Sequence, residues 1–125
     1  MILGIGVDIV EIDKLRLAMI RRGERLRDRA FTRSEIDYCE GRANKFQHYS
    51  ARFAAKEAVF KAIGTGWRGG VSWQDAEVSN QMNGKPILLL RGRTLELTNL
   101  MGARKYWISL SHTDQYAVAQ VVLED

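Results

Sequence analysis

The sequence predicts an α+β fold in which a mostly antiparallel sheet packs against a long central helix. Three observations support this class. Apolar, strand-like stretches rich in β-branched residues lie at the two ends of the chain. A hairpin signal lies in its middle, and an alanine-rich stretch of near-helical periodicity comes between the two. The expected sheet is therefore built from strands at the start, middle and end of the chain.

Residues 2–10 predict the first strand, because β-branched residues dominate and both faces are largely apolar. Strand alternation divides its side chains between two faces: Gly4, Gly6 and Asp8 on one, and Leu3, Ile5, Val7 and Ile9 on the other. The two glycines leave open space beside the acidic residue.

Two helical segments follow this strand. Residues 12–29 have helical periodicity, which Gly23 is expected to break into two pieces. Thr32 with Glu35 three residues later is a capping-box pattern. We therefore expect a short helix from that point to about Gly41.

Residues 44–63 form the strongest helix candidate, and Gly64 is the expected stop signal. A glycine-rich exit, Gly64–Thr65–Gly66, leads away from this helix. It follows the C-terminal end of the helix, which is the wrong end of the macrodipole for capturing an anion. We expect a C-cap and a tight backbone that lets a ligand approach closely.

The second half of the chain is expected to be mainly β structure. Residues 71–90 predict a hairpin that turns at Asn83–Gly84. A short amphipathic helix is expected over 93–101. Residues 107–111 and 116–123 predict a final hairpin.

The composition limits the class of protein. At 125 residues the chain is long enough for one domain, here taken as residues 1–125, and not for several. Its 46% hydrophobic and 27% charged residues are typical of a globular protein. No apolar run is long enough to span a bilayer, and no signal peptide is visible. The single cysteine, Cys39, excludes an internal disulfide and favours the reducing cytoplasm. The net charge of +4 suits an anionic partner.

Asp8 is the first candidate functional residue. A carboxylate within an apolar strand costs on the order of several kcal/mol unless it is paired, hydrogen-bonded or bound to a metal. Asp8 therefore either caps a loop or meets an arginine at the end of its strand, or it binds a cation. The strand alone leaves both readings open.

Glu57 and Lys61 are four residues apart in the central helix and so share one face. They are either an ordinary surface pair, or Glu57 binds a hard cation while Lys61 meets a phosphate oxygen. Mg²⁺ usually takes one or two carboxylates and completes its shell with waters and substrate phosphates. Asp8 and Glu57 would meet that demand if the first strand packs on the central helix.

The arginine-rich stretch 14–29 is either a solvated helix face or a docking surface for an acidic partner. A small RNA-binding module is the alternative from another class, because arginines would contact phosphates and aromatic rings would stack on bases. Aromatic residues are only 9% and scattered, and an RNA-binding module leaves Asp8 and Glu57 unexplained.

Several of these segments together resemble one known family. They are Gly4 to Ile12 (GIGVDIVEI), Arg52 to Ala58 (RFAAKEA) with Lys61 and Gly64–Thr65–Gly66, and Ser109 to His112 (SLSH) with Tyr116 to Ala119 (YAVA). The chain resembles the holo-(acyl-carrier-protein) synthases, which are small 4′-phosphopantetheinyl transferases, over essentially its whole length.

The resemblance implies an activity and a set of ligands. Members of the family transfer 4′-phosphopantetheine from coenzyme A to a serine of apo acyl carrier protein, need Mg²⁺, and release adenosine 3′,5′-bisphosphate. Small members are homotrimers with active sites between subunits. The resemblance thus implies a cytoplasmic homotrimer with acyl carrier protein and coenzyme A as partners, and with neither nucleic acid nor a membrane.

The resemblance also implies roles for particular residues. The implied metal ligands are Asp8 and Glu57, and the implied catalytic residues are Glu57 and Lys61. The residues implied to bind coenzyme A are Arg52, Lys61, Gly64, Thr65, Gly66 and His112. The residues implied to dock the carrier are Lys14, Arg16, Arg21, Arg22 and Arg25.

Three questions stay open at the level of the sequence. The general base is either Glu57 or a metal-ordered water, and the carrier serves either fatty-acid or polyketide synthesis. The loop Trp67–Gly70 and Trp73 differ from the typical family pattern. This difference leaves the adenine contacts open.

Overall fold

The computed structural model describes residues 1–66 and 69–125. It contains two antiparallel sheets, one of three strands in the order β1-β5-β4 and one formed by the β2–β3 hairpin. The strands are β1 (Ile2–Glu11), β2 (Ala76–Asn80), β3 (Pro86–Leu90), β4 (Lys105–His112) and β5 (Tyr116–Glu124). The predicted α+β class with antiparallel strands is therefore confirmed.

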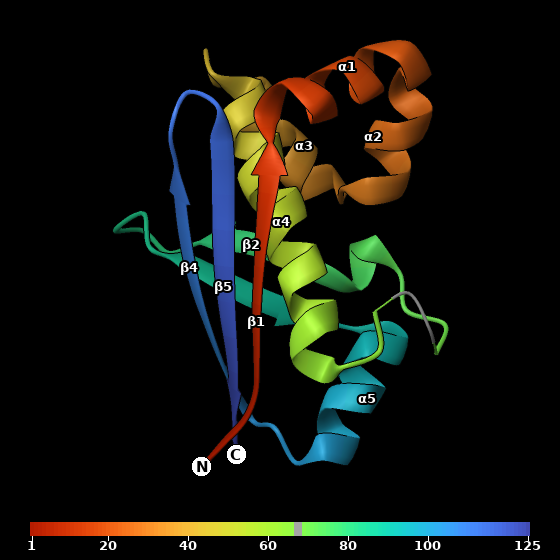
Figure 1. The fold of residues 1–125 in the computed structure, drawn as a ribbon, viewed down its shortest axis with the longest axis vertical. Coiled ribbons are helices and arrows are strands. Elements are labelled where there is room, and N and C mark those ends of the chain that lie inside the picture. The colour runs from red at the N-terminus through yellow and green to blue at the C-terminus, as the bar shows by residue number, and fades with distance from the viewer. Residues whose placement is uncertain (67–68) are drawn as a thin grey trace.

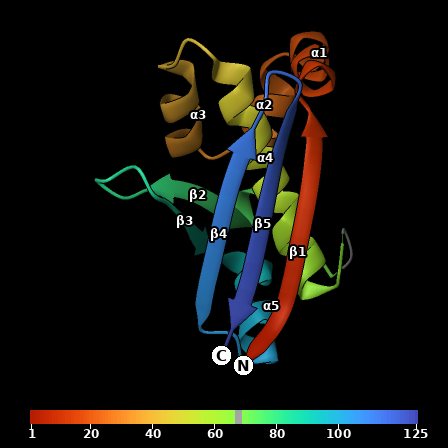
Figure 2. The same ribbon diagram turned by 60° about the vertical axis from the view of Figure 1, so that its left-hand side comes forward.

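The helices lie on one side of the three-stranded sheet, and α4 packs directly against it (Figures 1 and 2). They are α1 (Ile12–Arg22), α2 (Glu24–Ala30), α3 (Arg33–Glu40), α4 (Lys45–Ile63) and α5 (Gly92–Met101), with a short 3₁₀ helix, η1 (Trp73–Asp75). In the part of the chain that the structure describes, no helix is long and apolar enough to cross a lipid bilayer.

The predicted helix boundaries are confirmed where local chemistry sets them. Gly23 separates α1 from α2 with a φ of +61°, a value that glycine adopts without strain. Thr32 and Glu35 form the reciprocal capping box that starts α3. Gly64 ends α4 in the left-handed conformation, and its N–H donates to the carbonyls of Phe60 and Lys61.

The structure differs from the prediction in the middle of the chain. The strands β2 and β3 pair with each other as a separate sheet instead of joining the other three. Strand β2 begins only at Ala76, because Trp73–Asp75 form η1, which a capping box between Ser72 and Asp75 closes. Leu3 also departs from the predicted face. A register shift between Ile2 and Gly4 turns Leu3 toward the core.

Helix α4 is the centre of the molecule, and most of its residues are buried. It lies between the three-stranded sheet and the remaining elements, and small side chains such as Ala54, Ala55 and Ala58 let its neighbours approach. A helix enclosed on all sides has no polar face to give it a clear amphipathic pattern.

A buried ion pair joins α4 to three other elements. The Lys56 Nζ lies 2.7 Å from the Glu35 Oε1 of α3, and it donates to the carbonyls of Trp73 in η1 and Ala76 in β2. Both side chains are fully buried. Either charge would be costly to bury without the other. The hydrogen bonds of this pair therefore hold η1 and the start of β2 against α4.

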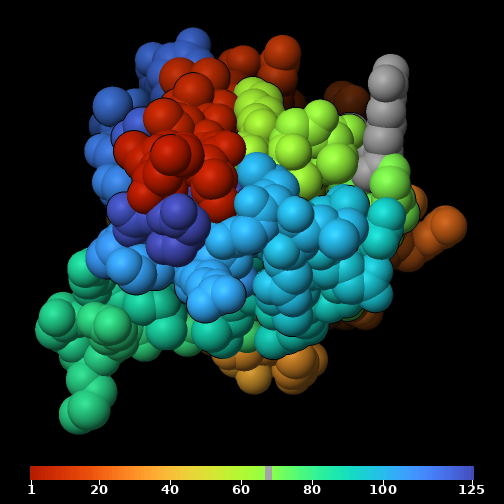
Figure 3. Space-filling view, turned by 90° about the horizontal axis from the view of Figure 1, so that it is seen from below, coloured from red at the N-terminus to blue at the C-terminus, as the bar shows by residue number. Residues whose placement is uncertain are grey.

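The outer face of the three-stranded sheet points away from α4 (Figure 2). On its β1 side this face is apolar and exposed. Ile5, Val7 and Ile9 of β1 are more than half exposed, and Trp107 of β4 and Tyr116 of β5 are nearly so. Seen from below, the turn between β2 and β3 projects from the body of the molecule, and Met82 in this turn is fully exposed (Figure 3).

Candidate active site

Strand β1 lies unusually close to α4 because two glycines face the helix. A Cβ atom on Gly6 would overlap the carbonyl oxygen of Ala58 and lie 2.8 Å from the backbone nitrogen of Ala62. A Cβ atom on Gly4 would overlap the Ala62 carbonyl oxygen. Only glycine permits this approach, which places the next inward-facing residue of β1, Asp8, beside α4.

Asp8 and Lys61 form an ion pair between β1 and α4. The Lys61 Nζ lies 2.9 Å from the Asp8 Oδ1 and donates a second hydrogen bond of 3.1 Å to the Val7 carbonyl. The Asp8 side chain is 17% exposed, whereas that of Lys61 is 55% exposed. The ammonium thus reaches the carboxylate from the solvent side.

Glu57 lies one turn before Lys61 on α4 and is half-buried. Burial and then the neighbouring Asp8 carboxylate raise the pKa of Glu57, while Lys61 and the Trp73 side chain lower it. The effect of Asp8 on this pKa places both carboxylates in one electrostatic environment. The packing of strand on helix that the cation hypothesis requires is therefore present.

These two carboxylates fit a hard divalent cation. Within residues 1–66 and 69–125 no group of three or more histidine, cysteine, aspartate or glutamate side chains could hold a metal. Mg²⁺ needs only one or two carboxylates when phosphates and waters supply its other ligands. The mutual repulsion of Asp8 and Glu57 is what such a cation relieves.

Arg52 lies five residues before Glu57 on α4, about one and a half turns away, and is only 2% exposed. Its Nη2 donates a 2.7 Å hydrogen bond to the Asn80 side chain of β2, and its guanidinium stacks 4.0 Å from the Tyr38 ring centre. Its buried Nε has no hydrogen-bond partner among the described residues. An arginine in this state has remaining capacity for an anion.

Three arginine and histidine side chains contact the Tyr38 ring: Arg42, His48 and Arg52. We call these four residues, together with His112, which acts electrostatically on His48, the Tyr38 cluster. Arg42 stacks 3.7 Å from the ring centre, and His48 meets the ring edge-on at 5.6 Å. Burial and then Arg52, Arg42 and His112 lower the pKa of His48, because both a desolvated site and nearby positive charge disfavour the protonated ring.

The Tyr38 cluster brings together two predicted residues, Arg52 and His112, and adds others that the sequence reasoning missed. His48 had a usable signal, because it precedes Arg52 by four residues within the predicted central helix. Arg42 had none, because α3 folds back on α4 through contacts that spacing does not encode. His112 is exposed at the end of β4, opposite Ala117 of β5.

The exit from α4 has the predicted tight backbone. Gly64 and Gly66 both have positive φ values, +88° and +56°, and a Cβ on either would meet open space. Thr65 between them is partly buried. Trp67, in the loop that differs from the typical family pattern, lies outside the described residues.

The predicted docking residues divide into two groups. Arg21, Arg22 and Arg25 line a groove of about 710 Å³ between the α1–α2 pair and η1. The other lining residues of this groove, which we call the arginine groove, are Leu26, Arg29 and Trp73. No carboxylate of the described chain forms an ion pair with any of its four arginines.

Lys14 and Arg16 lie outside the lining of the arginine groove and already have counterions. Lys14 pairs with Glu11 at 3.9 Å, and Arg16 pairs with Asp13 at 3.3 Å. Of the five predicted docking residues, the groove residues therefore have the stronger unbalanced charge.

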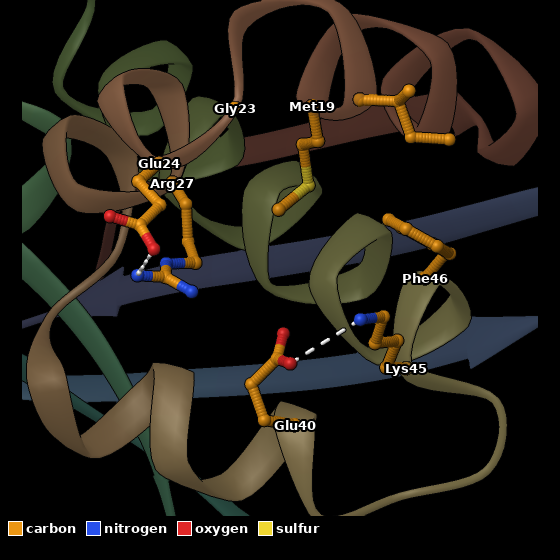
Figure 4. A pocket seen from close by; sticks show the side chains of 8 residues that line it. Met19, Gly23, Glu24, Arg27, Glu40, Lys45 and Phe46 are labelled. Atoms are coloured by element: carbon orange, nitrogen blue, oxygen red, sulfur yellow. Dashed lines mark hydrogen bonds and ion pairs between the residues drawn. The ribbon is translucent and has the colours of Figure 1, made fainter.

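A second, smaller hollow of about 220 Å³ lies between the α1–α2 pair and the α3–α4 pair (Figure 4). Its charged residues neutralise one another, because Arg27 lies 3.7 Å from Glu24 and Lys45 lies 3.3 Å from Glu40. This balance makes it a poor site for an anion, in contrast to the arginine groove.

Comparison with known proteins places the chain in a family. The family model for the 4′-phosphopantetheinyl transferase superfamily matches residues 4–121. A holo-(acyl-carrier-protein) synthase of Koribacter versatilis is 48% identical over 125 residues, which is the full length of both proteins.

Two solved structures have the same fold. The holo-(acyl-carrier-protein) synthase of Neisseria meningitidis has a TM-score of 0.91 and 30% identity over the whole of both chains. The enzyme of Bacillus anthracis, solved in complex with CoA (3′,5′-ADP), has a TM-score of 0.81 and 36% identity over 98% of this chain and 96% of that one. The motif resemblance, the family match and these full-length similarities agree, and the chain belongs to the holo-(acyl-carrier-protein) synthases of the 4′-phosphopantetheinyl transferase superfamily.

Proposed function

We propose that this protein transfers the 4′-phosphopantetheine group from coenzyme A to a serine of apo acyl carrier protein and releases adenosine 3′,5′-bisphosphate. The observation that carries this proposal is the meeting of Asp8, Glu57 and Lys61 at the contact of β1 with α4. Relatives similar over the full length bear the name of this activity, and one solved relative contains CoA (3′,5′-ADP).

The reaction exchanges one phosphate ester for another. The serine oxygen of the carrier forms a bond to the phosphorus that bears the pantetheine, and the bridging P–O bond of the diphosphate breaks. The chain needs no nucleophile of its own, because the partner supplies the serine. Its task is to hold two substrates in line and to balance negative charge on the leaving phosphate.

Asp8 and Glu57 are the residues that would hold Mg²⁺, and when bound it neutralises charge on the diphosphate oxygens. Lys61 lies beside them with an exposed ammonium, which can stabilise or protonate the leaving oxygen. These roles require no further acidic ligand from the chain.

The serine proton has two possible acceptors. Glu57 is suited to accept it, because burial and Asp8 raise the pKa of this carboxyl. A metal-ordered water is the alternative acceptor.

Other residues would bind the adenosine 3′,5′-bisphosphate part of coenzyme A. Arg52 would supply positive charge and His112 a ring N–H for the 3′-phosphate, and the unused Nε of Arg52 supports this assignment. The backbone at Gly64, Thr65 and Gly66 lets the ligand approach closely.

The carrier would dock on α1 and α2. Acidic side chains of the carrier suit the arginine groove, with Arg21, Arg22 and Arg25 as its main contacts. Lys14 and Arg16, which are already paired, would add to the positive field around it.

We place the reaction in the cytoplasm and in a homotrimer. The single cysteine, Cys39, is a buried free thiol, and burial raises its pKa to about 12, so it fits a reducing compartment as an inert core residue. The exposed apolar face of the three-stranded sheet provides a surface for contact between copies.

The test is a direct transfer assay. The protein is mixed with coenzyme A, Mg²⁺ and apo acyl carrier protein, and the mass of the carrier is followed. We expect the carrier to gain one phosphopantetheine group. Asp8→Ala and Glu57→Ala should each lower the rate at least about a hundredfold at ordinary Mg²⁺, with the circular dichroism spectrum unchanged. Near-normal turnover in both variants would show that the metal assignment is wrong.

A further inference from the structure

The contact between Lys61 and Asp8 affects how a divalent cation and coenzyme A bind at the site. The Lys61 ammonium occupies one oxygen of the Asp8 carboxylate at 2.9 Å. The same carboxylate is one of two that would hold the divalent cation. Two cations cannot share it without strong repulsion at that distance.

We propose that Lys61 competes with the divalent cation for the Asp8 carboxylate, so that cation binding releases the ammonium toward the diphosphate of coenzyme A. This inference rests on the proposed function and deepens it. It makes Lys61 the residue that couples the binding of the metal to the binding of the nucleotide substrate.

The surroundings of Lys61 allow such a displacement. Its side chain is 55% exposed and has a flexible four-carbon stem, whereas Asp8 is 17% exposed and belongs to a paired strand. The other contact of the ammonium, to the Val7 carbonyl at 3.1 Å, can be replaced by water because the group is exposed. Lys61 therefore moves more easily than Asp8.

Glu57 makes the competition asymmetric. A divalent cation gains from both carboxylates, whereas the recorded ion pair of Lys61 is with Asp8 alone. Once displaced, the ammonium loses the one carboxylate with which it forms an ion pair among the described residues, and a diphosphate anion would replace it. Cation and coenzyme A should therefore strengthen each other's binding by the same factor.

The binding of Mn²⁺ tests this inference without reference to turnover. Binding is measured as the loss of the EPR signal of the free ion. We expect Lys61→Met to bind Mn²⁺ alone about fivefold more tightly than the unaltered protein, because the competing cation is gone. Coenzyme A should tighten Mn²⁺ binding in the unaltered protein, and it should do so by a clearly smaller factor in Lys61→Met.

Three further variants complete the experiment. Lys61→Arg keeps the positive charge and should bind Mn²⁺ like the unaltered protein. Lys85→Met removes an exposed lysine at the β2–β3 turn, which lies over the Trp107 ring and far along the chain from Asp8 and Glu57, and it should have no effect. Asp8→Asn should greatly weaken Mn²⁺ binding.

Equal or weaker Mn²⁺ binding in Lys61→Met would overturn the competition, as would an undiminished effect of coenzyme A in that variant. If Lys61→Met gives one of these results while Asp8→Asn weakens Mn²⁺ binding, only the role of Lys61 is refuted and the metal site stands. If Asp8→Asn binds Mn²⁺ normally, the metal assignment within the proposed function fails as well.

Discussion

At the scale of single residues, Gly6 determines how close β1 lies to α4. Any side chain at this position would collide with the backbone of Ala58 and Ala62, which cannot move without displacing the central helix. The position of Asp8 relative to Glu57 depends on that spacing. A substitution of Gly6 would therefore change both the stability of the fold and the geometry of the site.

We expect Gly6→Ala to lower the free energy of unfolding by about 3 kcal/mol, because overpacking against backbone is poorly relieved. Urea denaturation followed by circular dichroism measures the change. Gly41→Ala is the matched control. Its φ is −76° and the nearest atom to a new Cβ lies at 3.6 Å, so it should be neutral or slightly stabilising. Equal stability of the two variants would contradict the close-packing argument.

His48 should make stability depend on pH. Burial and the neighbouring cations lower its pKa in the folded state, so the unfolded chain takes up a proton first as the pH falls. The free energy of unfolding should therefore decrease as the pH drops below about 6.5, and it should level off once the folded state is protonated too.

His48→Gln should remove this part of the pH dependence. Denaturant unfolding between pH 7.5 and 5 in both proteins measures it, and the difference in slope is the expected result. The same slope in both would mean that His48 is not held neutral by the Tyr38 cluster.

The sequence predicted some functional residues and missed others for a physical reason. Asp8, Glu57 and Lys61 were identifiable because a carboxylate in an apolar strand and a charged pair on a helix are local anomalies. Arg42 was not, because it is an ordinary surface residue until α3 packs on α4. Spacing along the chain does not encode that contact.

At the scale of elements, α1 and α2 carry the arginine groove. The break at Gly23 turns the second helix so that Arg21 and Arg22 of α1 and Arg25 and Arg29 of α2 line one hollow. A continuous helix over 12–29 would spread these side chains along a rod. The glycine thus converts a basic stretch of sequence into a concave surface.

Reversing two charges in this groove should weaken carrier binding specifically. We expect Arg21→Glu with Arg25→Glu to raise the KM for apo acyl carrier protein about tenfold, with little change in the KM for coenzyme A. Lys14→Glu with Arg16→Glu changes the net charge equally and should have a smaller effect, because these side chains already have counterions. Steady-state kinetics at low salt measure both pairs, and equal effects of the two pairs would refute a docking role for the groove.

The boundaries of helices and strands were predictable where local capping interactions set them. They were less predictable where tertiary contacts set them. Thr32 with Glu35 and Gly64 after the central helix mark their boundaries in the sequence itself. The sequence predicts strand at Trp73–Asp75, where the structure has a 3₁₀ helix, because the buried Lys56 that binds the Trp73 carbonyl comes from a distant segment. Long-range hydrogen bonds of this kind override local preference.

At the scale of the whole molecule, the two ends of the chain meet in one sheet. Strand β1 pairs with β5, and the two ends of the chain lie close together (Figure 1). The Met1 ammonium forms an ion pair with Asp125. Periodicity identified both strands but not their pairing, nor that β2 and β3 would form a separate sheet. The pairing follows from α4, which covers one face of β1 and β5 and leaves the other face exposed.

The oligomeric state can be tested on that exposed face. Ile5, Val7 and Ile9 project from β1 beside Trp107 and Tyr116, and a patch of this kind marks a contact surface. In the proposed trimer each substitution occurs three times around one axis.

Ile5→Lys would bring three charges to an apolar contact, where each costs on the order of several kcal/mol without a partner. We expect sedimentation equilibrium to give three times the 14.2-kDa chain mass for the unaltered protein and a single chain mass for Ile5→Lys. Leu100→Lys alters an isolated apolar residue of α5 that is 79% exposed, and it should leave the trimer intact. A trimer that survives Ile5→Lys would show that the outer face of the sheet is not the contact between copies.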